Sequence, residues 1–157
     1  MKAHVARGAL VVVLLLVAGC GGSGSGSSTV AQESTFRTDF KLSVTQFKKT
    51  AHDIGVAVKN APSQSNSEIA STFTGLAADW QANLTHLKSL TPPASVAGEF
   101  TAMTDAAAKA EADLNAIVAA AQTSDANAAK LAAEKMVTDV LAAKAASQTI
   151  EHKLGIT

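Results

Sequence analysis

The 157-residue chain contains one cysteine, Cys20, no tyrosine, and only 4% aromatic residues. A lone cysteine cannot form an intramolecular disulfide, and the absence of Cys-x-x-Cys-His excludes a c-type haem. The sequence also contains no Gly-x-Ser-x-Gly nucleophile elbow and no Glu-x-x-His metal motif. We therefore expect no enzymatic activity and no catalytic residue in this chain.

The charges are balanced and scattered, with 13 basic and 13 acidic residues. Nucleic acids and anionic lipid surfaces attract clustered lysines and arginines, and Lys48-Lys49 is the only adjacent basic pair. A solvated helix face explains that pair. We expect no nucleic-acid partner.

The side chains that could ligate a metal or transfer protons are poorly spaced for either task. His52, His86 and His152 do not lie three or four residues from one another, so they predict no metal or haem site. Glu111 and Asp113 are two residues apart, and side chains at that spacing on a helix do not face each other. These groups are expected on solvated surfaces, with no metal and no cofactor.

The first residues have the composition of an export signal. Lys2 and Arg7 precede ten apolar residues, Ala9 to Ala18, which small residues then follow. As a helix this segment would rise about 15 Å, roughly half of the hydrocarbon core of a bilayer. It is too short for a permanent membrane span, so we interpret residues 1–19 as a signal peptide that is removed.

The segment Val17–Cys20 resembles the lipobox of bacterial lipoprotein precursors, which has an aliphatic residue, two small residues and then a cysteine. The resemblance implies cleavage between Gly19 and Cys20 and attachment of diacylglycerol to the Cys20 thiol. Each buried CH₂ contributes about 0.8 kcal/mol, so two or three acyl chains anchor a protein stably. The expected location is the extracytoplasmic face of a bacterial membrane, and the expected prosthetic group is this lipid alone. The alternative is an ordinary secreted protein with an incidental cysteine.

A glycine and serine tract, Gly21 to Ser28, follows the cysteine and predicts a flexible coil with an end-to-end distance of about 16 Å. The chain thus divides into a signal peptide (1–19), a lipidated cysteine with a tether (20–31) and a folded domain (32–157). Removal of residues 1–19 leaves 138 residues with a net charge of −2, a length suited to one domain.

Apolar residues recur at steps of three and four in four blocks, at about 32–60, 67–90, 95–122 and 126–153. Proline or serine-rich breaks separate them, and no segment alternates with a period of two. Ser65 or Ser67 can cap the second helix, and Thr123-Ser124-Asp125 supplies a turn and a cap for the fourth. We predict an all-α fold, an antiparallel up-down-up-down four-helix bundle. A pair of long hairpins that dimerise is the alternative, and the oligomeric state stays open.

Large side chains are unevenly distributed, because all five phenylalanines and the only tryptophan lie between Phe36 and Phe100. The last two blocks are rich in alanine. A solid core results if the alanine faces approach closely; otherwise a narrow apolar slot bounded by Phe47 and Trp80 remains for a ligand. Gly55 and Gly75, inside predicted helices, suggest a local close approach or kink.

Residues 87–93 and 153–156 are similar to segments of small, uncharacterised bacterial envelope lipoproteins with helical-bundle domains. That resemblance implies a shape, a helical rod on a lipid tether, and no activity. We expect a non-catalytic binding or scaffolding module whose partner is another cell-envelope component. The alternative is a carrier of a small apolar or lipid-like ligand. A scaffold should expose a contiguous apolar patch, whereas a carrier should contain the slot beside Phe47 and Trp80.

Overall fold

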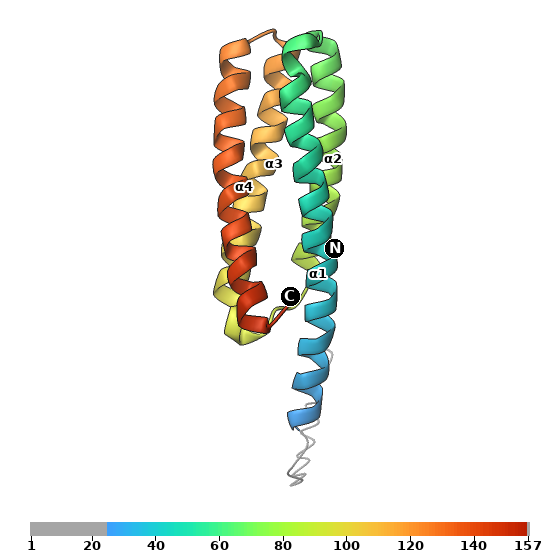
Figure 1. The fold of residues 1–157 in the computed structure, drawn as a ribbon, viewed down its shortest axis with the longest axis vertical. Coiled ribbons are helices and arrows are strands. Elements are labelled where there is room, and N and C mark those ends of the chain that lie inside the picture. The colour runs from blue at the N-terminus through green and yellow to red at the C-terminus, as the bar shows by residue number, and fades with distance from the viewer. Residues whose placement is uncertain (1–24, 157) are drawn as a thin grey trace, which may run out of the picture.

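The computed structural model describes residues 25–156, in which four long helices run antiparallel to their neighbours in the sequence (Figure 1). No strand occurs in this range. The predicted all-α fold, an up-down-up-down four-helix bundle, is confirmed. In chain order the elements are α1 (Ser25–Asn60), the 3₁₀ turn η1 (Ala61–Ser63), α2 (Asn66–Ser89), the 3₁₀ turn η2 (Ala94–Val96), α3 (Ala97–Gln122) and α4 (Ala126–Leu154).

The helix ends follow from local sequence chemistry. Ser65 forms a capping box with Glu68: its hydroxyl accepts from the Glu68 backbone N–H, while the Glu68 carboxylate accepts from the Ser65 N–H. The Asp125 side chain accepts from the backbone N–H of Ala128 at the start of α4. Gly155 ends α4 with a left-handed φ of 61°, which suits a residue without a Cβ. Both predicted caps are confirmed.

Helix α1 begins at Ser25, whereas the sequence predicts a flexible coil from Gly21 to Ser28 and a helix only from about residue 32. The reason is cooperativity, because adding a residue to an existing helix costs far less than nucleating one, even for serine and glycine. The ion pair between Arg37 and Glu33, 2.6 Å long and one turn apart, supports this part of the helix. Figure 1 shows these N-terminal turns projecting beyond the other helices. Phe36 is the first buried side chain from Val30 onward.

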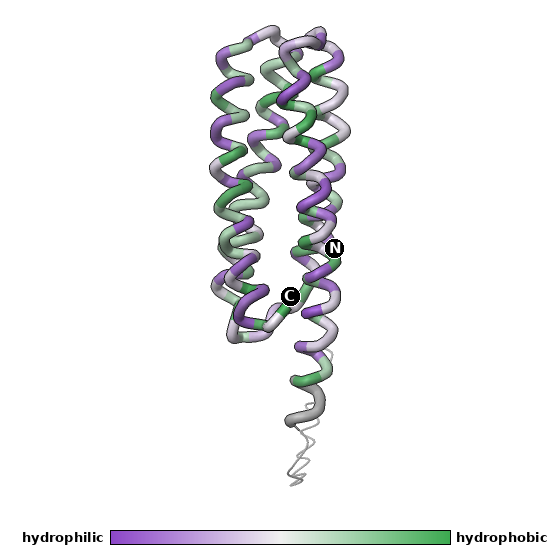
Figure 2. The backbone as a smooth tube through the Cα atoms, viewed as in Figure 1, coloured by the Kyte–Doolittle hydropathy of each residue, from purple (hydrophilic) through white to green (hydrophobic). Residues whose placement is uncertain are grey.

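Each helix is amphipathic, and Figure 2 shows hydrophobic and hydrophilic residues alternating along all four. Buried aromatic rings gather at one end of the bundle, where Phe36 and Phe40 of α1 meet Phe100 of α3. Gly55 and Gly75 occupy exposed positions, and a Cβ at either would meet nothing within 4 Å. The prediction of a close approach at these glycines is therefore wrong.

The four helices are not packed evenly around the bundle. Helix α3 lies close against α4, and the buried residues of both helices include many small side chains, among them Ala107, Ala110 and Ala143. Helix α1 packs on α2 and approaches α4 at few points. The bundle is therefore held loosely along one of its four seams, the seam between α1 and α4.

Candidate ligand-binding cleft

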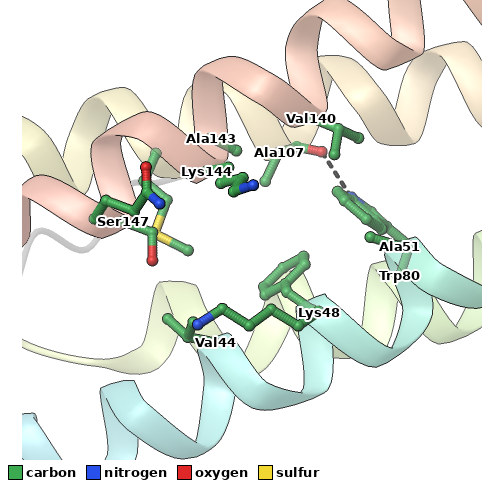
Figure 3. Close-up of a pocket in the computed structure, with 12 residues that line it drawn as sticks. Val44, Lys48, Ala51, Trp80, Ala107, Val140, Ala143, Lys144 and Ser147 are labelled. Atoms are coloured by element: carbon green, nitrogen blue, oxygen red, sulfur yellow. Dashed lines mark hydrogen bonds between the residues drawn. The ribbon is translucent and has the colours of Figure 1, made fainter. Parts of the chain in front are cut away.

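A cleft of about 320 Å³ opens along the seam between α1 and α4 (Figure 3). This volume lies within the range of about 300–1,000 Å³ that is typical of small-molecule sites. All four helices contribute to it. The lining residues are Val44, Phe47, Lys48 and Ala51 of α1, Trp80 of α2, Met103 and Ala107 of α3, and Val140, Ala143, Lys144, Ser147 and Gln148 of α4.

Trp80 forms a fixed wall of the cleft. Its side chain is only 2% exposed, and its indole N–H donates a hydrogen bond of 2.8 Å to the carbonyl oxygen of Ala107, drawn as a dashed line in Figure 3. The Phe47 ring meets the indole edge-on, with centroids 4.9 Å apart and planes at 78°. These contacts join α1, α2 and α3, so the aromatic wall is rigidly positioned.

The buried part of the opposite wall is made of short side chains from α4, and the longer Lys144 and Gln148 lie at exposed positions. Ala143 and Ser147 are one helical turn apart and both are buried. A larger residue at either position would extend toward α1 and fill the seam. The cleft therefore follows from the alanine-rich sequence of α4 facing the aromatic residues of α1 and α2.

The polar groups of the cleft are cationic or neutral. Lys48 and Lys144 come from opposite walls (Figure 3), and the remaining polar side chains are Ser147 and Gln148. Lys48 forms a long, exposed ion pair of 3.4 Å with Glu151. The Ser147 hydroxyl is buried and has no hydrogen-bond partner among the described residues.

A second cleft of about 420 Å³ lies at the end of the bundle where η1 and the turn between α3 and α4 meet. Its polar groups are already engaged. Asn66 donates to the Ser124 hydroxyl at 2.8 Å, Asp125 caps α4, and Lys130 lies 3.9 Å from Glu134. The sequence did not predict this cleft, because it depends on how the connecting turns close over the helix ends.

The structure brings the two residues of the predicted slot, Phe47 and Trp80, together in one cleft. Cys20 and Gly19, the predicted lipidation and cleavage residues, lie outside the described residues. His52, His86 and His152 are all exposed. No group of three potential metal ligands occurs within residues 25–156.

One carboxylate pair was missed by the sequence analysis. Asp113 was compared with Glu111 on its own helix, but in the bundle it lies near Asp139 of α4. Burial, and then the negative charge of Asp139, raise the pKa of Asp113 above its ordinary value of 3.8, although Lys135 opposes the shift. The Asp113 Oδ2 atom is buried without a hydrogen-bond partner in the described part of the chain. Only the pairing of α3 with α4 reveals this contact.

No protein-family model matches the chain, and comparisons with curated proteins and with solved structures give no match. Within the described residues, none of the helices is both long and apolar enough to cross a membrane.

Proposed function

We propose that this protein is a lipid-anchored, extracytoplasmic carrier that holds a small apolar ligand in the cleft between α1 and α4. The observation that supports this function most directly is the lining of the cleft, in which aromatic and small apolar side chains face one another across about 320 Å³. No reaction is proposed for the cleft, because the Ser147 hydroxyl forms no hydrogen bond to a base among the described residues.

The carrier is preferred to a scaffolding module because of where the apolar surface lies. Large exposed hydrophobic residues are spread over two helices in the described region, with Val30, Leu42, Val56 and Val58 on α1 and Leu131, Val137 and Leu141 on α4. Among those on α4, Val137 and Leu141 are one turn apart. Two neighbouring side chains make a small patch by the standard of the apolar surfaces through which proteins bind one another.

Ligand binding can be tested with the chain from residue 20 onward carrying Cys20→Ala, here called the unlipidated protein, so that no acyl chain or detergent competes. The apolar fluorophore N-phenyl-1-naphthylamine is added while energy transfer from Trp80, the only tryptophan, is recorded. We expect saturable transfer, because Trp80 lines the cleft.

The matched variants are Ala143→Leu, which fills the cleft, and Ala142→Leu, which makes the same change at an exposed position of the same helix. Ala143→Leu should weaken fluorophore binding at least about ten-fold, a change of about 1.4 kcal/mol. Ala142→Leu should leave binding unchanged. Equal binding by both variants, or no saturable binding by the unlipidated protein, would contradict the proposed carrier function.

The proposed membrane anchor rests on Cys20 and is tested separately, in the cell. The full-length protein should sediment with membranes and resist extraction by salt, whereas Cys20→Ala should be released into the soluble fraction. A Cys20→Ala variant that stays with the membrane in high salt would refute lipidation as the anchor.

A further inference from the structure

We infer that the ligand of this cleft is a single-chain amphiphile with an anionic head group, a carboxylate or a phosphate, whose head is bound by Lys144 and Ser147. This inference rests on the proposed carrier function and specifies the chemistry of the ligand. Three features of the cleft support it: the charge of its side chains, the unpaired hydroxyl of Ser147 and its volume.

The charges of the cleft have one sign. Two lysines, Lys48 and Lys144, are among its lining residues, and no aspartate or glutamate is. A lysine ammonium has three donors and no acceptor, so it binds oxyanions and repels cations. An electrically neutral apolar ligand would make no use of either ammonium group.

Ser147 provides a second and independent observation. Its side chain is 4% exposed, it lines the cleft, and its Oγ atom has no hydrogen-bond partner in the described region. Other buried helical hydroxyls in this protein are satisfied locally: Ser43 donates to the Asp39 carbonyl and Thr50 to the Gln46 carbonyl. A buried hydroxyl without a partner destabilises the protein because it has lost its hydrogen bonds to water, and a ligand oxygen in the cleft would restore one.

Lys144 is the cation best placed to act with Ser147. The two residues are three positions apart on α4, so their side chains lie on the same side of the helix. Lys144 makes no ion pair or hydrogen bond with any described residue, and no acidic residue lies one turn away from it in the sequence. Its ammonium group can therefore pair with a ligand anion without first leaving a protein carboxylate.

Lys48 is a secondary contact on the α1 wall. It interacts with Glu151 at 3.4 Å, and its side chain is 66% exposed. An ion pair with so exposed a lysine is weak and exchanges readily. Lys48 can turn toward a bound anion, but Glu151 competes for it, so the inference depends on Lys144.

The rest of the cleft suits a hydrocarbon chain. Phe47, Trp80, Met103 and Ala107 provide an apolar surface next to the polar residues of α4. A volume of about 320 Å³ holds about ten groups of the size of a water molecule, at about 30 Å³ each. A chain of about ten carbon atoms fills it, and a longer chain would leave the cleft through its opening between α1 and α4.

The test compares four compounds that share a ten-carbon chain and differ in the head group: decanoate, decyl phosphate, decanol and decyltrimethylammonium. Each is titrated into the unlipidated protein, and displacement of N-phenyl-1-naphthylamine gives its affinity. Decanoate or decyl phosphate, or both, should bind about ten-fold more tightly than decanol, and the cation should bind most weakly. The stronger of the two anions identifies the head group.

Lys144→Gln and Ser147→Ala should each remove most of the preference for the anion while leaving the affinity for decanol unchanged. Lys130→Gln is the matched control, since Lys130 is a lysine of the same helix that lines the second cleft. Equal affinities for decanol and both anions would overturn the inference and leave the carrier function standing. Loss of anion preference in Lys130→Gln but not in Lys144→Gln would also overturn it. Failure of all four compounds and of the fluorophore to bind would refute the carrier function itself.

Discussion

Replacing Trp80 with phenylalanine should lower the free energy of unfolding by about 2.5 kcal/mol. The variant loses the buried hydrogen bond from the indole N–H to the Ala107 carbonyl, which contributes about 1 kcal/mol. It also loses the second ring, whose two additional buried carbon positions contribute about 0.8 kcal/mol each. The Ala107 carbonyl belongs to α3 and keeps its helical hydrogen bond, so no further penalty for an unpaired acceptor is expected.

Urea unfolding followed by far-ultraviolet circular dichroism measures this loss, because helical signal does not depend on the tryptophan that has been removed. The midpoint should fall with an unchanged dependence of free energy on urea, as expected when only the native state is weakened. A loss below about 1 kcal/mol would show that the indole does not join α2 to α3 as described.

A double-mutant cycle isolates the ring contact between Trp80 and Phe47. Phe47→Leu is combined with Trp80→Leu, each of which removes one ring, and the coupling energy is obtained from the two single variants and the double variant. The edge-on geometry at 4.9 Å predicts a coupling of about 0.5–1.5 kcal/mol. Additive losses would mean that the rings only fill space.

Two further substitutions test the electrostatics and the exposed glycines. Asp113→Asn should stabilise the protein by about 0.5 kcal/mol at pH 7, because it removes a charge that burial and Asp139 disfavour. Because the pKa of Asp113 is raised, its carboxyl binds a proton more readily in the folded state than in the unfolded state, and its charge destabilises the fold as the pH rises above 3.8. The stability gained by Asp113→Asn should therefore vanish below that pH in thermal melts. Gly55→Ala and Gly75→Ala should each raise stability by about 1 kcal/mol in urea unfolding, since their Cβ atoms meet open space; a loss would indicate a close approach.

The number of helices and most of their ends could be predicted because the signals are local. Apolar spacing defines each stripe, and Ser65 and Asp125 cap α2 and α4 as their positions suggest. The start of α1 could not be predicted in this way. Serine and glycine favour a coil when considered alone, but Ser25 to Ala31 extend a helix that packing nucleates further along.

The aromatic side of the cleft could also be anticipated, and its polar side could not. Phe47 and Trp80 stand out as large residues opposite alanine-rich helices. Ser147 has the spacing of a core residue, so periodicity alone assigns it to a stripe with Ala143 and Ile150. Whether its hydroxyl finds a partner depends on rotamer and neighbours, which no sequence pattern reports. The proximity of Asp113 to Asp139 likewise depends on the relative rotation of α3 and α4.

The cleft results from the uneven distribution of large and small side chains among the four helices. The many alanines of α3 and α4 allow these two helices to pack closely against each other. The rings of Phe36 and Phe40 pack against Phe100 of α3 at one end of α1, and Phe47 packs against Trp80 of α2 further along. The buried positions of α4 that line this seam, Ala143 and Ser147, then carry only short side chains. The seam between α1 and α4 is therefore the place where this bundle can accept additional apolar volume without moving its core.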